Sequence, residues 1–305
     1  LVCGVKVFMG SSTGNMLVDD PEVLAGIFKH SPVLIVTHCE DTPMITENEK
    51  AAFEKYGEDV PMEEHAEIRS RQACLKSSSL AVKLAKEHGS NLHVLHLTTK
   101  DELDMFTQGE IDNKKITAEV CVHHLSFDKR DYATLGSQIK CNPSVKLKED
   151  REALIKAVNE NVIDIIATDH APHTWDEKQQ KYFKAPSGLP LVQHVLLKLF
   201  EFYHEGVFSL EKIVNKTSHN VAKRYQIKNR GYIREGYWAD LVLVDLNKPQ
   251  TVTKESLRYK CGWSPFVGQE FRSTVKATLV NGNIIYKDGQ IISDAKGVAL
   301  EFDRK

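Results

Sequence analysis

The sequence predicts an α/β fold, part of a (β/α)8 barrel, followed by a small β-rich region. Three observations support this prediction. Short apolar runs alternate with segments that carry apolar residues at helical spacing, which is the pattern of a βα repeat. Several of these runs end in His or Asp, as residues 162–168 do before Asp169. From residue 229 onward, the pattern changes to short strands joined by tight-turn dipeptides.

The composition limits the class of protein. The chain has 305 residues, of which 41% are hydrophobic and 27% charged, with a formal net charge of -2. This is typical of a soluble globular protein with one large and one small domain. The 40 Lys and Arg residues nearly balance the 42 Asp and Glu residues, and no basic block occurs, which argues against nucleic acid as a partner. No apolar run approaches the ~20 residues that span a membrane, and the first residues carry no signal-peptide pattern.

The six cysteines are spread singly, without a CxxC pair. This spacing is typical of buried thiols in a reducing compartment rather than of a disulfide framework. Cys39 and Cys141 adjoin candidate site residues, but the sequence places no base that would activate either thiol, so we interpret both as structural. We therefore expect a cytoplasmic protein.

The first strand is predicted over residues 2–10, with Lys6 inside it. A lysine in such a place usually extends its ammonium group to the end of the strand. Pro21 begins a short helix, and the next strand ends at His38. Residues 40–63 are polar and contain two prolines and a glycine, so we expect a lid or a long loop there.

A helix is predicted over residues 65–88, because apolar residues recur at helical spacing and a glycine follows. The strand after it ends at His96. Another strand, over residues 116–122, runs into His123 and His124. Adjacent residues of a strand point to opposite faces, so we interpret these two histidines as structural.

The strand that ends at Asp169 follows an amphipathic helix at about residues 149–161. His173 lies four residues further on, and because Pro172 disfavours a helix, the two side chains would converge from a turn. The loop of residues 171–190 is long and polar and contains three lysines, Lys178, Lys181 and Lys184. Loops of this kind often close over a ligand. A helix is predicted over residues 191–203.

Five strands of the α/β body carry or precede Lys6, His38, His96, residues 116–122 and Asp169. A single His or Asp at a strand end is better explained as part of the core or of a polar loop. Three such endings on separate strands are hard to explain in that way, and imidazole and carboxylate groups are metal ligands. Side chains from well-separated strands converge naturally at the carboxyl ends of a closed eight-stranded barrel. We therefore expect a metal site there.

Two domains are predicted. Residues 1–228 form a partial (β/α) barrel with the catalytic site, and residues 229–305 form a small β domain. Asn281-Gly282 and Asp288-Gly289 are strong tight-turn signals in the second domain.

The motifs also have an order and spacing that are specific together, although each is weak alone. They are Gly4-Val5-Lys6-Val7-Phe8-Met9, Thr37-His38-Cys39-Glu40, Val94-Leu95-His96-Leu97, Glu119-Val120-Cys121-Val122-His123-His124-Leu125, Cys141-Asn142-Pro143-Ser144, Thr168-Asp169-His170-Ala171-Pro172-His173, Ser187-Gly188-Leu189-Pro190, Gly231-Tyr232-Ile233-Arg234-Glu235-Gly236 and Ala239-Asp240-Leu241-Val242. Over nearly the whole chain, this series resembles the dihydroorotases, which are cyclic amidohydrolases of the amidohydrolase superfamily.

The resemblance implies a TIM-type (β/α)8 barrel of the metal-dependent hydrolase kind, represented here by about its last five βα units. It also implies two Zn2+ ions at the barrel mouth, bridged by a carboxylated Lys6, since an ammonium group cannot ligate a metal. His38 and His96 would bind the second metal. Asp169 would bind the first metal and serve as the catalytic proton-transfer group.

The function implied by the resemblance is that of a dihydroorotase, the reversible zinc-dependent cyclisation of N-carbamoyl-L-aspartate to L-dihydroorotate in de novo pyrimidine biosynthesis. Asn142 and His173 would hold the substrate, with His173 facing its exocyclic carboxylate. The backbone around Ser187 and Gly188 would bind the edge of the ring. We expect a small-molecule substrate, neither nucleic acid nor membrane as a partner, and allow for a homodimer.

Two alternatives stay open. A dihydropyrimidinase, hydantoinase or allantoinase would share the metal ligands and the cyclic-amide chemistry. His173 favours the dihydroorotases, because a substrate carboxylate needs a cationic or donor partner that a hydantoin does not. A non-catalytic scaffold homologue is the other alternative, but such proteins typically lose metal ligands, and every ligand expected in this span is present.

The family pattern also includes a His-x-His pair on the first barrel strand, followed by an Arg that meets the substrate carboxylate. Neither precedes Lys6, and the sequence yields five barrel strands where closure needs eight. We therefore expect that a longer polypeptide supplies the first three βα units. Residues 1–305 alone are then predicted to bind metal incompletely and to have little or no dihydroorotase activity.

Overall fold

A computed structural model describes residues 2–10 and 16–304. The chain divides into two compact units, one formed by residues 4–191 and the other by residues 192–304 with residues 2 and 3. Each unit is described by itself below.

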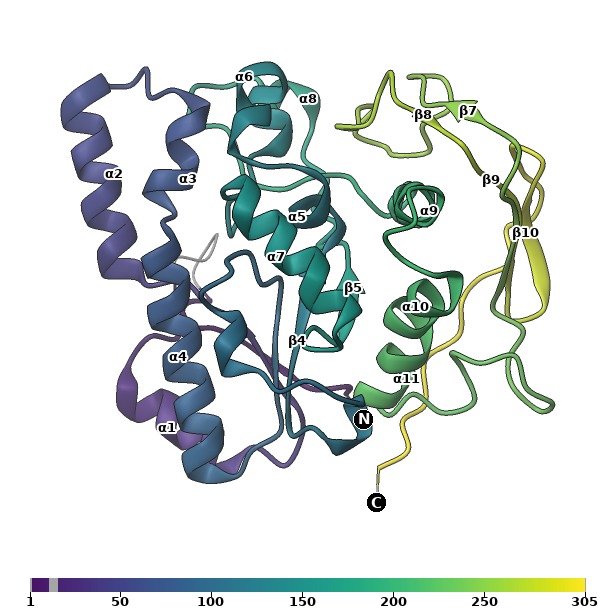
Figure 1. Ribbon diagram of the computed structural model, residues 1–305, viewed down its shortest axis with the longest axis horizontal. Helices are drawn as coiled ribbons and strands as arrows, with labels where there is room; N and C mark the ends of the chain where they lie inside the picture. Colours follow the sequence, from purple (N-terminus) through teal and green to yellow (C-terminus); the bar gives the residue numbers. More distant parts are fainter. Residues whose placement is uncertain (1, 11–15, 305) are drawn as a thin grey trace. The chain divides into compact units, whose positions relative to one another are not determined.

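The first unit contains a sheet of five parallel strands in the order β1-β2-β3-β4-β5, which is also their order along the chain. The strands are β1 (Val5–Phe8), β2 (Ile35–His38), β3 (Leu92–Val94), β4 (Ile116–Cys121) and β5 (Ile165–Ala167). Sequential parallel pairing joined by helices is the arrangement of a (β/α) barrel wall. The predicted fold class and its five strands are therefore confirmed (Figure 1).

Helices connect these strands. They are α1 (Pro21–His30), α2 (Thr42–Tyr56), α3 (His65–Ile68), α4 (Arg71–His88), α5 (Val122–Ser126), α6 (Tyr132–Leu135), α7 (Lys148–Asn159) and α8 (Trp175–Lys178). Helix α4 packs against β3, and α1 lies beside α4 (Figure 1). The helix predicted over residues 65–88 is interrupted, because Ser70 caps α4 by accepting a hydrogen bond from the backbone N–H of Ala73.

The prediction of a lid or long loop over residues 40–63 is wrong for most of its length, since α2 occupies it. Asp41 caps this helix by accepting a hydrogen bond from the Met44 N–H, and Gly57 ends it with φ 62°. Only Ile45 and Ala52 of this helix are buried. The helix therefore lacks the broad apolar stripe by which a helix is usually found in a sequence.

The prediction that a strand runs into His123 and His124 is also wrong. Strand β4 ends at Cys121, and the chain turns directly into α5. Neighbouring residues at the start of a helix do not alternate between two faces as in a strand. The two imidazole rings accordingly lie together, with their centroids 4.1 Å apart.

The second unit begins with α9 (Val195–His204), which starts four residues later than predicted, and continues with α10 (Leu210–Val214) and α11 (Asn220–Arg224). A four-stranded antiparallel sheet follows in the order β11-β10-β9-β6, and β7 pairs with β8 beside it. The strands are β6 (Leu241–Asp245), β7 (Gln250–Thr251), β8 (Glu270–Phe271), β9 (Thr274–Val280), β10 (Asn283–Lys287) and β11 (Gln290–Ile291).

Both predicted tight turns of this sheet are present. Asn281 and Gly282 join β9 to β10 with φ 52° and 82°, and Asp288 and Gly289 join β10 to β11 with φ 46° and 87°. Positive φ at both central residues is the requirement of the type I′ hairpin turn, which explains the choice of Asn-Gly and Asp-Gly.

Helix α9 belongs to the second unit through an ion pair. Glu201 of α9 accepts hydrogen bonds from the backbone N–H and the Nε of Arg272, at 2.7 and 2.8 Å. This contact joins α9 to the strands of the second unit, and the compact units divide after residue 191. The change of sequence pattern predicted a domain boundary at residue 228. None of the described helices is long and apolar enough to cross a membrane.

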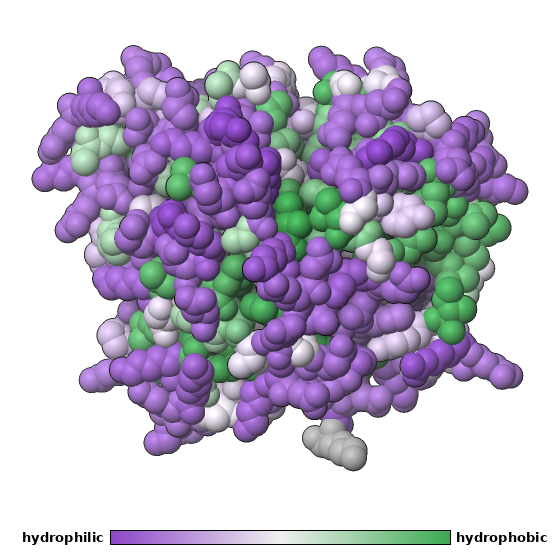
Figure 2. All heavy atoms as spheres, in the orientation of Figure 1, coloured by the Kyte–Doolittle hydropathy of each residue, from purple (hydrophilic) through white to green (hydrophobic). Residues whose placement is uncertain are grey.

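Hydrophilic side chains cover most of the face drawn in Figure 2, and apolar side chains gather over β9 and β10. The exposed apolar residues of this sheet include Val242, Leu243, Ile284 and Ile291. Together with the start of α9, the sheet lines a cavity of about 560 Å3 within the second unit.

Buried histidines in both units predict how stability depends on pH. Burial lowers the pKa of His194 to about 4, and burial, Lys140 and Arg69 lower the pKa of His65 well below its usual value. His65 Nε2 donates to the carbonyl oxygen of Cys141 at 2.8 Å, which leaves Nδ1 to accept from the Tyr182 hydroxyl at 2.7 Å. Both rings are therefore neutral in the folded protein at pH 7.

Below pH ~6.5, these two histidines become protonated in the unfolded chain but stay neutral in the folded protein. The free energy of unfolding therefore falls as the pH drops toward 4. For His194 alone, the loss at pH 5 is on the order of 2 kcal/mol. Urea unfolding at pH 7, 6 and 5 measures this loss. In H194N the free energy of unfolding should change less steeply with pH. The exposed His88 supplies the control, since H88Q should leave the slope unchanged. A free energy of unfolding that is flat between pH 7 and 5 would contradict the neutral assignment.

Candidate metal and substrate site

The carboxyl ends of the parallel strands carry the residues predicted to bind metal. Lys6 lies on β1, His38 is the last residue of β2, and His96 follows β3 by two residues. Asp169 follows β5 by two residues. Because the strands are parallel, with Phe8 paired to His38 and Thr37 to Val94, one edge of the sheet carries His38, His96 and Asp169. Lys6 lies two residues before the end of β1.

The two histidines meet directly. His38 Nδ1 lies 3.0 Å from His96 Nε2, and the rings are edge-to-face with centroids 4.8 Å apart. Two imidazole nitrogens bound 2.0–2.1 Å from one tetrahedral zinc ion would be about 3.3 Å apart. The observed spacing therefore fits two ligands of a single metal ion.

Lys6 and Asp169 lie within electrostatic reach of this pair. Burial raises the pKa of Asp169, Lys6 lowers it, Glu119 raises it and His38 lowers it, with a net increase. Burial lowers the pKa of His96 well below its usual value, and His38, His124 and Lys6 act in the same direction. The structure thus places His38 and His96 in contact, with Lys6 and Asp169 within electrostatic reach. The ligand atoms of His38, His96 and Asp169 do not all lie within 4.8 Å of one another.

The backbone at two of these positions is unusual. His96 has φ 39° and Asp169 has φ 46°, in the left-handed region that non-glycine residues seldom adopt. Such strain persists only where the surrounding structure holds the residue, and it clusters at functional sites. The Asp169 side chain therefore leaves its strand in an enforced direction.

Glu40 and Arg69, neither of which was predicted as a site residue, support His38. His38 Nε2 lies 3.0 Å from Glu40 Oε2, and Arg69 Nη1 donates to the same oxygen at 2.5 Å. Burial acts to raise the pKa of Glu40, but Arg69 and His38 lower it well below its usual value. A carboxylate on one ring nitrogen fixes the orientation of an imidazole whose other nitrogen faces a metal. Glu40 lies two residues after His38 in the sequence, and this spacing is the signal that could have identified it as a partner of His38.

The donor set fits zinc. His38 Nδ1 and His96 Nε2 offer two ring nitrogens 3.0 Å apart, and the Asp169 carboxyl group lies within electrostatic reach of His38. Imidazole and carboxylate are the ligands of catalytic zinc sites that keep a position open. Lys6 as an ammonium adds no ligand, whereas a carboxylated Lys6 would add two oxygen atoms.

The predicted substrate residues lie on two further segments. His173 Nε2 is 3.2 Å from the carbonyl oxygen of Ser187. Gly188 has φ +146°, and a Cβ atom there would lie 2.6 Å from the carbonyl oxygen of Ala171, so only glycine fits. Asn142 precedes a cis peptide bond to Pro143, and its Oδ1 is buried without a hydrogen-bond partner among the described residues.

Two buried lysines connect these segments, and we call them the lysine clamp. Lys178 Nζ donates to the carbonyl oxygens of Lys140, Pro186 and Gly188 at 3.1, 2.8 and 3.0 Å. Lys140 Nζ donates to the carbonyl oxygens of Tyr182 and Ala185 at 2.5 and 2.6 Å. The sequence analysis took Lys178 as part of a polar loop, but it is completely buried. The lysine clamp therefore joins the segment before Asn142 to the segment around Ser187.

A parallel α/β sheet with imidazole and carboxyl groups at its carboxyl edge is the arrangement of a (β/α) barrel with a candidate metal site. The chain belongs to the Amidohydrolase family, which it matches over residues 20–285.

Relatives within this family include the dihydroorotase of Clostridium acetobutylicum, 34% identical over 206 residues, which are 67% of this chain and 48% of that protein. The dihydroorotase of Pyrococcus horikoshii is 31% identical over 292 residues, which are 96% of this chain and 63% of that protein. The chain thus spans about half to two thirds of the length of these relatives.

Solved structures show the same fold. The L-hydantoinase (dihydropyrimidinase) of Arthrobacter aurescens superposes with a TM-score of 0.87 at 23% identity, over 95% of this chain and 66% of that one. A D-hydantoinase superposes with a TM-score of 0.87 at 21% identity, over 100% of this chain and 69% of that one. At these identities the likeness concerns the fold.

The lysine clamp can be tested by replacing Lys178 with a side chain of similar length that cannot donate. K178M leaves three buried carbonyl groups without this donor, which should destabilise the protein by about 2–4 kcal/mol. Hydrogen exchange at the Gly188 N–H, which donates to the Lys140 carbonyl at 2.8 Å, should accelerate at least tenfold.

K184M is the matched control, because Lys184 lies in the same loop and is exposed. Equal exchange rates at Gly188 in K178M and K184M would show that Lys178 does not hold the loop.

Proposed function

We propose that the protein is a dihydroorotase, which interconverts N-carbamoyl-L-aspartate and L-dihydroorotate with zinc in pyrimidine biosynthesis. The observation that carries the proposal is the 3.0 Å approach of His38 Nδ1 to His96 Nε2 beside the buried carboxyl group of Asp169. The similarity to proteins named dihydroorotase, at 31–34% identity, supports the same activity.

The residues divide the chemistry between them. His38 and His96, with Asp169 and a carboxylated Lys6, would hold the metal. When bound there, zinc supplies a Lewis acid and a water of lowered pKa, which an unreactive cyclic amide requires. Glu40 and Arg69 keep the His38 ring oriented.

Asp169 serves as the proton-transfer group. Hydrolysis of dihydroorotate requires a base that takes the proton of the attacking water and then an acid that protonates the leaving ring nitrogen. Burial raises the pKa of Asp169 above that of an ordinary aspartate, which suits it to hold a proton between these two events. In the biosynthetic direction the same carboxyl group works in reverse order.

Asn142, His173 and the backbone at Ser187 and Gly188 hold the substrate. The Asn142 amide supplies donors and an acceptor of the kind that a ring amide needs. The Ser187 carbonyl lies 3.2 Å from His173 Nε2, so Nε2 carries a hydrogen, and His173 donates to the substrate carboxylate through Nδ1 as the imidazolium. The lysine clamp holds both segments in place.

A hydantoinase or dihydropyrimidinase is the second candidate, since solved proteins of those names have this fold. His173 separates the two proposals, because dihydroorotate carries an exocyclic carboxylate that hydantoin and dihydrouracil lack. The non-catalytic alternative is disfavoured by the retention of two converging imidazoles and a buried carboxyl group.

Metal binding tests the site first. Zinc added to the demetallated protein should bind, and H38A and H96A should each weaken its affinity at least tenfold, because each removes one ligand nitrogen. Isothermal titration together with metal analysis measures this. H88A at an exposed position should bind zinc as the unaltered protein does. Unchanged zinc affinity in both H38A and H96A would remove the basis of the proposal.

Activity and substrate binding test the function itself. Zinc-loaded protein should form N-carbamoyl-L-aspartate from dihydroorotate, and D169N should lower the rate at least a thousandfold while the substrate still binds. Binding of dihydroorotate and of dihydrouracil is measured in parallel. Zinc-dependent preference for dihydrouracil would favour the second candidate.

His173 should decide between the substrates. H173A is expected to weaken binding of dihydroorotate about 10- to 100-fold, since a hydrogen bond to a charged group contributes roughly 1.5–3 kcal/mol. Binding of dihydrouracil should change less than threefold. His170 supplies a neighbouring control, because its Nδ1 accepts from the Leu191 N–H and H170N retains an acceptor. Equal losses for both ligands in H173A would refute the role of this side chain in recognising the carboxylate.

A further inference from the structure

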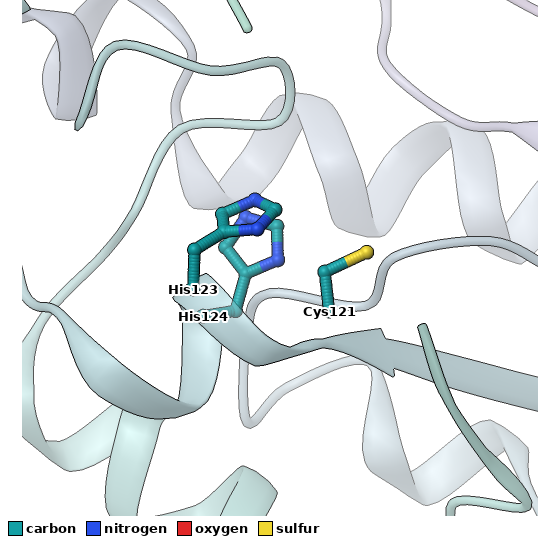
Figure 3. Close-up of side chains that lie close together, drawn as sticks. All are labelled: Cys121, His123 and His124. Carbon is teal, nitrogen blue, oxygen red and sulfur yellow. The ribbon is translucent and has the colours of Figure 1, made fainter. Parts of the chain in front are cut away.

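A second group of metal-binding side chains lies where β4 turns into α5. Cys121 ends the strand, and His123 and His124 stand in the first turn of the helix. The sulfur of Cys121 and one nitrogen of each imidazole lie within 4.8 Å of one another. All three side chains are buried, with exposed fractions of 0%, 1% and 3%. The two rings, with centroids 4.1 Å apart, overlap in Figure 3, and the sulfur of Cys121 points away from them.

The imidazoles of this group are short of partners. Neither nitrogen of His123 has a hydrogen-bond partner among the described residues, and neither does His124 Nδ1. Buried polar atoms are almost always paired, so three unpaired nitrogens in one place call for a ligand. The three unpaired nitrogens belong to two different rings, so the orientation of one ring does not account for all of them.

The tautomer of His124 makes one of these nitrogens a free electron-pair donor. His124 Nε2 lies 3.0 Å from the carbonyl oxygen of Pro143, which can only accept, so Nε2 carries the hydrogen. The lone pair then resides on Nδ1. His123 offers a lone pair on one nitrogen in either neutral tautomer.

We propose that Cys121, His123 and His124 bind a thiophilic divalent ion of the zinc class, at a site separate from that of His38, His96 and Asp169. One sulfur and two imidazole nitrogens select zinc, and they are unsuited to calcium or magnesium, which prefer oxygen. Binding replaces the S–H bond of Cys121 with a sulfur–metal bond and releases one proton to the solvent.

The geometry requires a small adjustment. Ligands on a tetrahedral zinc ion are about 3.3–3.8 Å apart, given Zn–N of 2.0–2.1 Å and Zn–S of about 2.3 Å. The present spread of up to 4.8 Å exceeds this by about 1 Å. In Figure 3 the thiol points away from the rings, so metal binding would require the sulfur to turn about the single χ1 angle of Cys121.

Cys141 lies on the Nε2 side of His124, away from the free Nδ1, and so is not one of the ligands. Its sulfur lies 3.9 Å from His124 Nε2 and donates to the Pro143 carbonyl at 3.1 Å. The proposed second metal site stands on its own observations and does not depend on the proposed function.

Cobalt(II) is the probe, because it takes zinc positions and absorbs light according to its ligands. The demetallated full chain, titrated with Co2+, should develop a sulfur-to-cobalt charge-transfer band in the near ultraviolet. C121S should abolish this band, and H123A and H124A should each weaken the affinity for Co2+, measured from this band, at least tenfold. C74S is the matched control, since Cys74 is equally buried but lies on α4. It should retain the band.

Two further measurements keep the result decisive. The double variant H38A/H96A should retain the charge-transfer band, because the proposed catalytic ligands contain no sulfur, and this separates the two sites. X-ray absorption of the H38A/H96A variant loaded with one equivalent of Co2+ counts the sulfur ligands while Cys121 is unchanged. A spectrum with no sulfur ligand, or a band that persists in well-folded C121S, would overturn the proposal.

Discussion

The parallel, sequential pairing of β1 to β5 is the constraint on which the candidate site depends. It brings the ends of strands that lie far apart in the chain to one edge, so that His38 and His96, 58 residues apart, touch at 3.0 Å. A one-residue slip between β2 and β3 would turn the side chains of one strand to the other face and separate the two rings. The register of buried apolar strands therefore sets the chemistry.

Burial then determines the protonation of the site. Imidazoles taken out of water stay neutral, and neutral imidazole is the form that ligates a metal. His96, His123 and His124 all have pKa values lowered by burial, whereas burial raises the pKa of Asp169. Loss of solvent at the strand ends thus keeps the imidazoles neutral and makes the Asp169 carboxyl group hold its proton more tightly. Arg69 offsets it at Glu40, which stays ionised to orient His38.

The substrate segments follow a different principle. Residues 171–190 contain little regular structure, and α8 is only four residues long. Their shape is maintained by ammonium groups that bind backbone carbonyls, as Lys178 does with three of them. The loop is thus ordered from its interior, and the N–H and the carbonyl of Gly188 are both hydrogen-bonded there, to the Lys140 carbonyl and to Lys178 Nζ.

The sequence by itself determined the α/β class, the five strands and the tight turns, because each depends on local patterns: apolar runs, helical spacing and Asn-Gly or Asp-Gly pairs. It also pointed to His38, His96 and Asp169, since a polar residue directly after an apolar run marks a strand end. Local capping signals at Asp41 and Gly57 were present but α2 lacked an apolar stripe, so it was missed. Only the tertiary structure decided that Lys178 is buried, that Arg69 reaches Glu40 and that His123 and His124 share one pocket beside Cys121. Whether a polar side chain is buried and which partner it meets depends on segments distant in the chain, and no local pattern records that packing.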